Sequence, residues 1–325
     1  MFEKYKEHFE IIELPDSRKS WLNRIKYEYF FFRKYSKDKD ILLWISIHDM
    51  TPRVHAKHEV TYFHNPTFAH KADRNDFKYS KKVFLFSLFY KYLYRLNVRS
   101  NDFVIVQQDW IADSISSVLK LDASRIMVMP AEHKLEKHTV DFSAKMKPYM
   151  FFFPSVCRHF KNFEIICEAS RILNRKGYGD LFQVYLTIDG SENLYAKEIV
   201  DKYGNEKNIH FCGLLPMDQV FSYYEKAGCL IFPSKMETWG LPISEAKQFS
   251  LPMLVADLPY AHETVGNYDK VCFFDEKNAE ELAEYMLKVI HGEDIFNKAE
   301  YIVRNKNVCR QWPEVIEKVL GEKQS

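Results

Sequence analysis

The sequence predicts an α/β protein of two doubly wound domains, each a parallel sheet with helices on both faces. Its 325 residues exceed the usual size of one domain, which is about 100–150 residues. Short apolar segments rich in β-branched and aromatic residues alternate with helical segments in both halves, a pattern typical of parallel sheets. The composition, 46% hydrophobic and 28% charged, excludes a disordered or fibrous chain.

The expected strands are short, and most are followed by a segment of helical character. In the first half they are residues 9–14, 40–48, 58–64, 102–107 and 125–130. In the second half they are residues 149–153, 183–189, 209–212, 228–232, 253–256 and 271–274. Helices are expected at 163–176, 193–203, 217–225, 242–249, 279–291 and 312–320. We place the domain boundary in the polar segment 131–147, which gives domains 1–145 and 146–325, and expect the last helix to pack back on the first domain.

The two halves differ in charge and in glycine content. Residues 1–150 contain 26 Lys and Arg against 19 Asp and Glu, whereas residues 151–325 contain 20 against 26. All ten glycines lie from Gly177 onward. Walker loops and dinucleotide-binding turns need glycine for close approach of the backbone to phosphate, so the first half can contain neither. A phosphate site is therefore expected in the second half.

Nothing in the sequence indicates a membrane span or export. The longest stretch without a charged residue, 60–70, has eleven residues, whereas a membrane-spanning helix needs about 20 apolar ones. The ionic opening residues do not resemble a secretory signal. The six cysteines form no Cys-x-x-Cys pair, which argues against a zinc ribbon or a disulfide framework. We expect a cytoplasmic protein with buried thiols.

Two basic, aromatic stretches of the first half, 18–39 and 78–99, suggest contact with an anionic membrane at its inner face. The second stretch has six Lys and Arg, seven aromatic residues and no acid. The alternative is that these helices simply cover the sheet, because Lys82 and Lys91 lie about half a helical turn apart and leave no clean amphipathic face. No recognition motif accompanies the basic residues, so we expect no nucleic acid partner.

The densest functional signal is an apolar strand, a loop and a helix start in the second half. Cys229-Leu-Ile-Phe-Pro-Ser234 is followed by Lys-Met-Glu237-Thr-Trp-Gly240-Leu-Pro-Ile-Ser-Glu245. Ligands bind where such a loop leaves the carboxyl edge of a parallel sheet, because free amides and the positive helix end point into that region. Gly240 permits close approach of an anion, and the Glu245 carboxylate can accept hydroxyl hydrogen bonds. Together they favour a sugar phosphate.

Around this loop the sequence resembles the retaining glycosyltransferases of family 4, which have the GT-B fold of two Rossmann-like domains facing a central cleft. Their mark is two glutamates separated by seven residues, as Glu237 and Glu245 are here. The resemblance covers about residues 146–322 and extends over five ordered blocks. Besides the glutamate pair, these are Phe153-Pro-Ser155-Val-Cys-Arg158-His-Phe-Lys161-Asn162, Leu186-Thr-Ile-Asp189-Gly190, Asn208-Ile-His-Phe-Cys-Gly213-Leu-Leu215 and Leu251-Pro-Met-Leu-Val-Ala256.

The resemblance implies a role for particular residues toward a nucleoside diphosphate sugar. Arg158 and Lys161 would grip the diphosphate in the turn that begins at Ser155, Glu245 would hold the ribose, and Glu237 would contact the donor sugar. The nucleobase would be bordered by Gly213 and Leu215, and backbone amides would come from Thr238, Trp239, Gly240 and Leu241. The implied reaction is hexosyl or deoxyhexosyl transfer, with retention, to a glycan or a lipid-linked acceptor in the biosynthesis of a surface polysaccharide such as lipopolysaccharide.

The match departs from the family in two places. The arginine in Pro154-Ser155-Val-Cys-Arg158 lies closer to Lys161 than in the family, which commonly has a Gly-Arg pair further upstream. In the first half, a histidine after an apolar strand resembles the one that faces the donor sugar, and His64 matches it better than His48. The usual first strand with a glycine-rich loop is not recognisable, so either the first domain lacks it or another segment takes over its role.

Two other functions fit the same fold. One is a non-catalytic subunit that binds nucleotide sugars, and the other is a nucleotide-sugar epimerase, which needs no acceptor. No metal cofactor is implied by the resemblance. Asp38-Lys39-Asp40 has the form of a metal-binding pair, but it precedes its strand among lysines and arginines, which favours a solvated charged turn.

Overall fold

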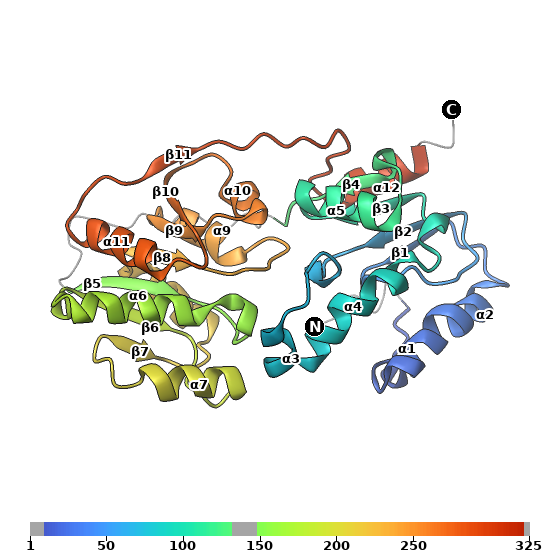
Figure 1. Cartoon of the computed structure of the whole chain (residues 1–325). Helices are drawn as coiled ribbons and strands as arrows, with labels where there is room; N and C mark the ends of the chain where they lie inside the picture. Colours follow the sequence, from blue (N-terminus) through green and yellow to red (C-terminus); the bar gives the residue numbers. More distant parts are fainter. Residues whose placement is uncertain (1–9, 132–147, 322–325) are drawn as a thin grey trace.

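The structure is a computed structural model, and it describes residues 10–131 and 148–321. It contains two sheets (Figure 1). A four-stranded sheet has the order β1-β2-β3-β4, and a seven-stranded sheet has the order β11-β10-β9-β8-β5-β6-β7. All pairings are parallel except that of β10 with β11. The predicted α/β class with parallel sheets is therefore confirmed.

In the first half the elements are η2 Pro15–Arg18, α1 Trp21–Lys26, η3 Tyr27–Phe31, α2 Phe32–Ser36, β1 Leu43–Ser46, β2 His58–Tyr62, η4 Pro66–Phe68, α3 Arg74–Tyr79, α4 Lys81–Arg95, η5 Val98–Ser100, β3 Phe103–Val106, α5 Asp109–Leu119, η6 Ala123–Arg125 and β4 Ile126–Val128. In the second half they are β5 Tyr149–Phe153, η8 His159–Lys161, α6 Phe163–Arg175, η9 Gly179–Leu181, β6 Phe182–Leu186, α7 Leu194–Tyr203, β7 Ile209–Phe211, α8 Met217–Lys226, β8 Cys229–Phe232, α9 Leu241–Gln248, β9 Met253–Ala256, α10 Pro259–Val265, β10 Tyr268–Phe274, α11 Ala279–Ile290, β11 Asn297–Ala299 and α12 Trp312–Gly321.

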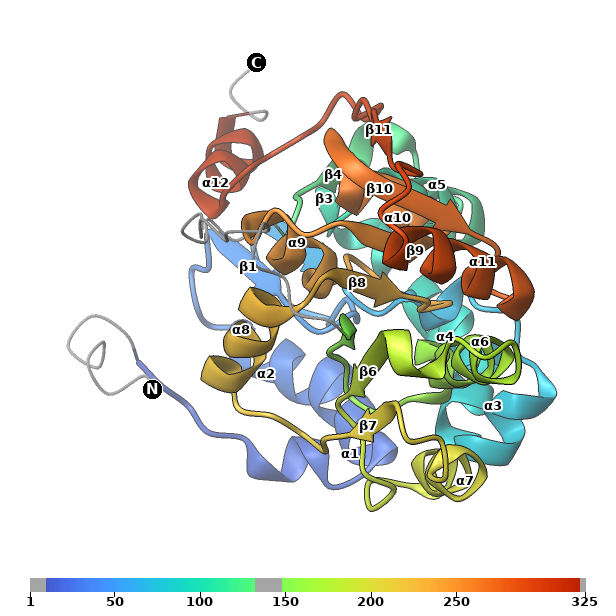
Figure 2. The same cartoon turned by 90° about the vertical axis from the view of Figure 1, so that its left-hand side faces the viewer.

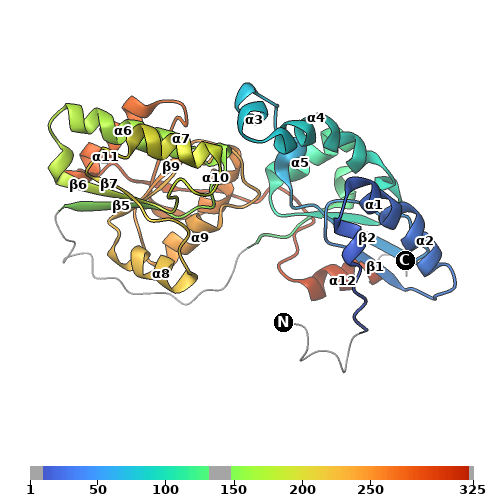
Figure 3. The same cartoon turned by 90° about the horizontal axis from the view of Figure 1, so that it is seen from below.

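The first sheet buries its two faces against different parts of the chain. Because side chains alternate along a strand, Val104 and Val106 of β3 face the core with α4 and α5, whereas Phe103 and Ile105 face the other side. That other side is covered by α12, whose Val315 is fully buried there. Figure 3 shows α12 on the opposite face of the sheet from α4 and α5. The first sheet is thus completed by the C-terminal end of the chain.

The chain returns to the first sheet through the segment between β11 and α12 (Figure 1). The amide of Val128 donates to Asn307 at 2.9 Å, and the amide of Cys309 donates to Val128 at 2.9 Å. These bonds place Val308 beside β4 in a parallel bridge. The first sheet therefore depends on residues that lie about 180 positions later in the sequence.

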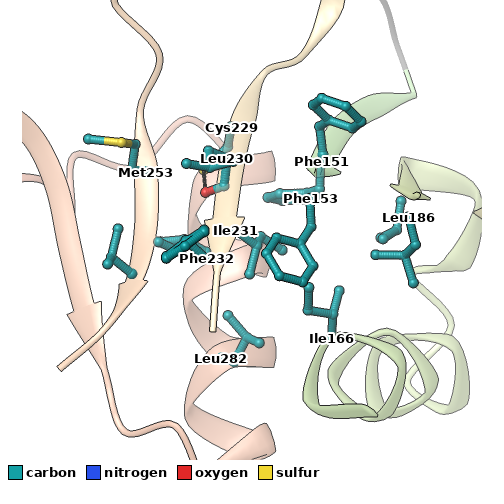
Figure 4. Close-up of a cluster of buried hydrophobic side chains, with 14 of the residues drawn as sticks. Phe151, Phe153, Ile166, Leu186, Cys229, Leu230, Ile231, Phe232, Met253 and Leu282 are labelled. Atoms are coloured by element: carbon teal, nitrogen blue, oxygen red, sulfur yellow. Dashed lines mark hydrogen bonds between the residues drawn. The ribbon is translucent and has the colours of Figure 1, made fainter. Parts of the chain in front are cut away.

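The second sheet is doubly wound around an aromatic core. Helices α6, α7 and α11 lie on one face, and α8 and α9 lie on the other (Figure 3). Figure 4 shows Phe153, Phe232 and Ile166 meeting between the central strands and α6, with Leu282 of α11 beside them. All four of these side chains are fully buried. The chain runs outward from β5 through β6 and β7, then crosses back to β8, so the direction of winding switches between β5 and β8.

Several elements differ from the predictions, among them α3 and α5, which no predicted helix range covers. Residue 9 lies outside the described residues, and residues 10–14 form no strand. Ile11 and Ile12 remain about half exposed, so no sheet buries the apolar side chains on which that prediction depended. Helix α10 and strand β11 were not predicted, because α10 is short and begins at a proline and β11 is the polar sequence Asn-Lys-Ala. The expected domain boundary falls on residues 132–147, outside the described part of the chain.

The carboxyl ends of the two sheets face each other. After β3, Gln108 donates from its side-chain amide to the carbonyl of Tyr260 at 3.0 Å and to the hydroxyl of Thr264 at 2.8 Å, both on α10, which follows β9. The amides of Asp109 and Trp110 donate to the Glu263 carboxylate at 2.7 and 2.8 Å. This carboxylate caps the start of α5, where amides are otherwise unsatisfied.

Candidate nucleotide-sugar site

The loops after β5 and β8 meet at the point where the winding of the second sheet reverses. In doubly wound sheets this is where ligands bind, because the two loops diverge from neighbouring strand ends. The amide of Lys235 donates to the carbonyl of Phe160 at 2.8 Å. The side chain of Asn162, in a left-handed conformation with φ of 63°, donates to Pro233 at 3.3 Å and to Glu276 at 2.9 Å. The two loops are therefore tied together.

Lys161 and Glu237 are brought into direct contact across these loops. The Lys161 ammonium forms an ion pair with the Glu237 carboxylate. Their side chains are only 12% and 14% exposed, so the pair lies largely out of water and is screened less than a surface pair. Seventy-six positions separate the two residues in the sequence. The structure thus joins the lysine and the glutamate to which the family resemblance assigns diphosphate and donor-sugar contacts.

Gly240 begins α9 immediately after the Glu237 loop. Its φ is 86°, a left-handed conformation that favours glycine. A Cβ atom at this position would lie 3.3 Å from the ring of Phe232. Trp239, just before it, is held by a 2.9 Å bond from its indole to Ser244 and by the Thr264 hydroxyl, which donates to its carbonyl. The turn that presents the first amides of α9 is therefore fixed from both sides.

Glu245 lies one turn into α9, but its carboxylate points toward α8. It accepts a 2.8 Å hydrogen bond from the hydroxyl of Tyr224. Burial, together with the nearby Glu245 carboxylate, raises the pKa of Tyr224 well above its usual range. Tyr224 is consequently a fixed donor at any physiological pH, and it orients the glutamate to which the resemblance assigns the ribose.

The other residues to which the resemblance assigns donor contacts lie in the loops and helix ends of the second half. The amide of Ser155 donates to the hydroxyl of Thr187 at 2.8 Å, and that hydroxyl donates back to the carbonyl of Ser155 at 2.8 Å. Gly213 follows β7 with φ of 67°, and a Cβ there would lie 2.9 Å from the Asp189 carboxylate. Leu215 packs against the core of the seven-stranded sheet. Thr238 is partly exposed, and Leu241 and Arg158 are exposed.

His64 lies at the carboxyl end of β2, and its described contacts are to the first half. The Asp49 carboxylate accepts the amides of His64 at 2.6 Å and Asn65 at 3.0 Å, and it lies 3.4 Å from the His64 ring nitrogen Nδ1. Burial raises the pKa of Asp49, although the nearby His64 acts to lower that pKa. The His64 side chain is 45% exposed. Among its described contacts, none joins it to Lys161 or Glu237.

His48 and Asp40 of the Asp38–Asp40 turn interact with other residues of the first half. The His48 ring lies 2.5 Å from the carboxylate of Glu28, and the His48 carbonyl accepts from Arg24 at 2.9 Å. Asp40 is exposed and pairs with Lys57 at 2.9 Å. Within residues 10–131 and 148–321, no cluster of three or more His, Cys, Asp or Glu is arranged to hold a metal ion.

A carboxylate from the first half supports the turn that carries Lys161. Asp76 of α3 is fully buried and accepts from His159 at 2.6 Å and from His70 at 2.7 Å. His159 lies in η8, two residues before Lys161. Burial alone would raise the pKa of Asp76, but hydrogen bonds from Asp73, His159 and His70 outweigh it and lower the pKa.

A second link lies beside this carboxylate, where Lys78 and the hydroxyl of Tyr79 bind Glu198 of α7 at 2.6 and 2.7 Å. Figure 2 shows α3 beside α7. Sequence reasoning missed Asp76 and His159. The Asp73-x-x-Asp76 capping pattern before α3 was the available signal, and His159 stands within the block quoted for the diphosphate turn. Neither pattern reveals that the two residues meet.

The fold is that of glycosyltransferases of the GT-B type. The sequence model of the family Glycosyl transferases group 1 matches residues 136–307, more than half of the chain, and the chain belongs to this family. It is 24% identical over 192 residues to the O-antigen chain mannosyltransferase RfbU of Salmonella typhimurium, covering 58% of this chain and 52% of that protein. The chain therefore spans about half the length of this curated relative.

Two solved structures show the same fold. Sucrose-phosphate synthase from Thermosynechococcus elongatus has a TM-score of 0.61 at 13% identity, covering 86% of this chain and 71% of that one. HepE of Anabaena, in complex with UDP and glucose, has a TM-score of 0.54 at 16% identity, covering 72% and 62%. No helix in the described residues has the length and apolar character that crossing a bilayer requires.

Proposed function

We propose that this chain is a retaining glycosyltransferase of family 4 that moves a hexosyl or deoxyhexosyl group from a nucleoside diphosphate sugar to a hydroxyl of a glycan or lipid-linked acceptor. The observation that carries the proposal is the contact of Lys161 with Glu237 at the switch point, beside the fixed start of α9. The mannosyltransferase relative and the UDP-bound neighbour support it. The relative's name favours a role in the biosynthesis of a surface polysaccharide.

The chemistry required of the site is stabilisation of a leaving diphosphate. Negative charge grows on this group as the bond to the sugar breaks, and fixed positive groups placed beforehand lower the barrier. Lys161 and Arg158 would supply full charges, and the amides from Thr238 to Leu241 would supply the helix end of α9. On this proposal, the donor diphosphate takes Lys161 from Glu237 and leaves that carboxylate for the donor sugar. No metal is assigned a role.

The acceptor would bind on the first half, residues 1–145 in the predicted division. His64 would face the donor sugar from the end of β2, held by Asp49 through its backbone and ring. Holding both substrates between two facing sheet edges supplies proximity, which in favourable systems is worth about 7–11 kcal/mol of the barrier. The contacts of Gln108 and Glu263 with the opposite half would set the spacing of those edges.

A donor panel tests the proposal. UDP, GDP, dTDP and their sugars are first screened by thermal shift, because a ligand that binds the folded state raises its melting temperature. Radiolabelled donors that bind are then incubated with glycan and lipid-linked acceptors, and NMR of the product reports the anomeric configuration.

Lys161→Met should abolish transfer, whereas Lys197→Met, at an exposed lysine of α7, should leave it unchanged. Absence of binding to every donor would refute the proposal. Binding without turnover would favour the non-catalytic alternative, and an inverted product would refute retention.

A further inference from the structure

The solvent face of α4 is apolar. Leu85, Leu88, Phe89 and Tyr92 are between 40% and 57% exposed. Their spacing of three, four and seven residues places them on one side of the helix. Helix α4 also has a buried side, where Tyr90 and Tyr94 pack into the first core. The helix therefore presents large apolar side chains both to the core and to solvent, which distinguishes this face from the scattered apolar residues of an ordinary surface.

A groove runs between this helix and the segment formed by η2 and α1. It has a volume of about 1030 Å³. Its floor is aromatic: Trp21 meets Phe86 and Tyr90 edge to face, with ring centres 5.1 and 5.7 Å apart. Leu85 and Phe89, from the exposed face of α4, also line it. The groove and the exposed face are thus one continuous surface, which we call the α1–α4 surface.

The rim of the groove is positively charged. The five charged residues that line it are all basic: Arg18, Lys19, Arg24, Lys81 and Lys82. Lys82 lies over the ring of Phe86 with its ammonium 5.4 Å from the centre. Lys19 and Arg24 have carboxylates within reach, Asp16 at 2.6 Å and Glu28 at 3.9 Å. The surface therefore combines apolar side chains with an excess of cations.

We propose that the α1–α4 surface docks on an anionic lipid bilayer. Cations beside exposed aliphatic and aromatic side chains complement such a membrane, because phosphate headgroups lie directly above apolar chains. The same charge argues against a second copy of this chain, since a two-fold contact would place like charges together. The surface stands on α1 and α4 alone, independently of the proposed sugar transfer.

From the sequence alone, membrane contact of this helix remained only one of two interpretations, because Lys82 and Lys91 do not share a face. The structure shows that the apolar residues, not the lysines, form the continuous stripe. Lys81 and Lys82 stand at its N-terminal end and Arg95 at its C-terminal end, all three exposed. This arrangement lets long basic side chains reach headgroups while the stripe enters the interface.

Co-sedimentation with vesicles tests the proposal. The full chain is mixed with vesicles of phosphatidylcholine alone and with vesicles of equal parts phosphatidylcholine and phosphatidylglycerol. We expect binding to the anionic vesicles only, and weakening of that binding as salt is raised, because exposed charges are screened.

The double variants Leu88→Ser with Phe89→Ser, and Lys81→Gln with Lys82→Gln, should each weaken binding about tenfold or more. The matched control is Ile302→Ser, which removes an exposed apolar side chain outside this surface. Circular dichroism and donor binding show that the variants remain folded.

Three results would overturn the proposal. The first is equal binding of the variants and the parent protein to anionic vesicles. The second is the absence of vesicle binding together with dimerisation that Phe89→Ser disrupts in sedimentation velocity, which would assign the surface to a second copy. The third is binding to a soluble polyanion such as heparin that needs the lysines but not Leu88 and Phe89, with no binding to vesicles. Unchanged transfer to a small soluble acceptor in both double variants would separate docking from catalysis.

Discussion

Replacing Asp76 with alanine should loosen the link between the first half and the turn that carries Lys161. The Asp76 carboxylate is fully buried and accepts hydrogen bonds from His70, His159 and the amide of Asp73. A hydrogen bond to a charged group contributes about 1.5–3 kcal/mol, and removing one partner of a buried pair costs about 3–5 kcal/mol. Because both histidines lose their acceptor, we expect a loss of about 3–5 kcal/mol.

The assay is a double-mutant cycle with Asp76→Ala, His159→Ala and the pair, with unfolding followed by denaturant and by amide hydrogen exchange in α3 and α6. The exchange readout matters because a chain with two sheets need not unfold in one step. The coupling between the two residues should be about 1–3 kcal/mol. Asp113→Ala is the control, because the Asp113 pair with Arg304 is exposed and such pairs are worth about 0–1 kcal/mol.

Two further readouts separate a positioning role from a purely structural one. Because His159 precedes Lys161 in η8, Asp76→Ala should raise KM for the donor more than it lowers kcat, and Asp76→Asn, which keeps one acceptor oxygen, should restore part of the loss. The lowered pKa of Asp76 means that its stabilisation is present at neutral pH and is lost as pH falls through the folded-state pKa. A coupling energy near zero, or an unchanged donor KM, would refute the reasoning.

Three other substitutions test separate parts of the structure. Gly240→Ala should cost about 1–2 kcal/mol of unfolding free energy. It should cost more than Gly177→Ala: both glycines have a φ near 85°, but of the two only Gly240 has a ring, that of Phe232, within 4 Å. Equal losses of unfolding free energy would contradict this. Burial raises the pKa of Glu263 from 4.5 to about 7, so its contribution to stability should fall as pH rises through that range, and Glu263→Ala should flatten this part of the melting curve against pH. Val315→Ala should cost about 1.5–3 kcal/mol and expose amides of the first sheet to exchange; unchanged exchange there would show that α12 does not hold the sheet.

The strands could be predicted because their signal is local. Tyr149–Phe153 and Met253–Ala256 have the predicted bounds, since each is a continuous apolar run that directly follows a proline, as suits a buried parallel strand. The failed strand at 9–14 shows the limit of the same reasoning. Ile11 and Ile12 are apolar, but an apolar pair becomes a strand only where a partner strand is available.

The residues of the candidate site likewise fall into those that the sequence indicated and those that only the structure shows. The sequence placed Lys161, Gly240 and Glu237 at loop and helix ends through the family resemblance, and the structure shows Lys161 in contact with Glu237. The sequence did not reveal the roles of Asp76 and Tyr224, because those roles depend on hydrogen-bond partners 83 and 21 positions away. A side chain shows its own chemistry in the sequence but not the group it faces.

By itself, the sequence determined the class of the fold, the order of its strands along the chain and the loops that carry charge. These depend on the periodicity of apolar residues and on glycine, which act over a few positions. Only the tertiary structure decided that α12 completes the first sheet, that Asp76 accepts a hydrogen bond from His159 and that α4 presents an apolar face to solvent. Each of these is set by which surfaces meet after folding, and burial is a property of the packed chain rather than of any segment.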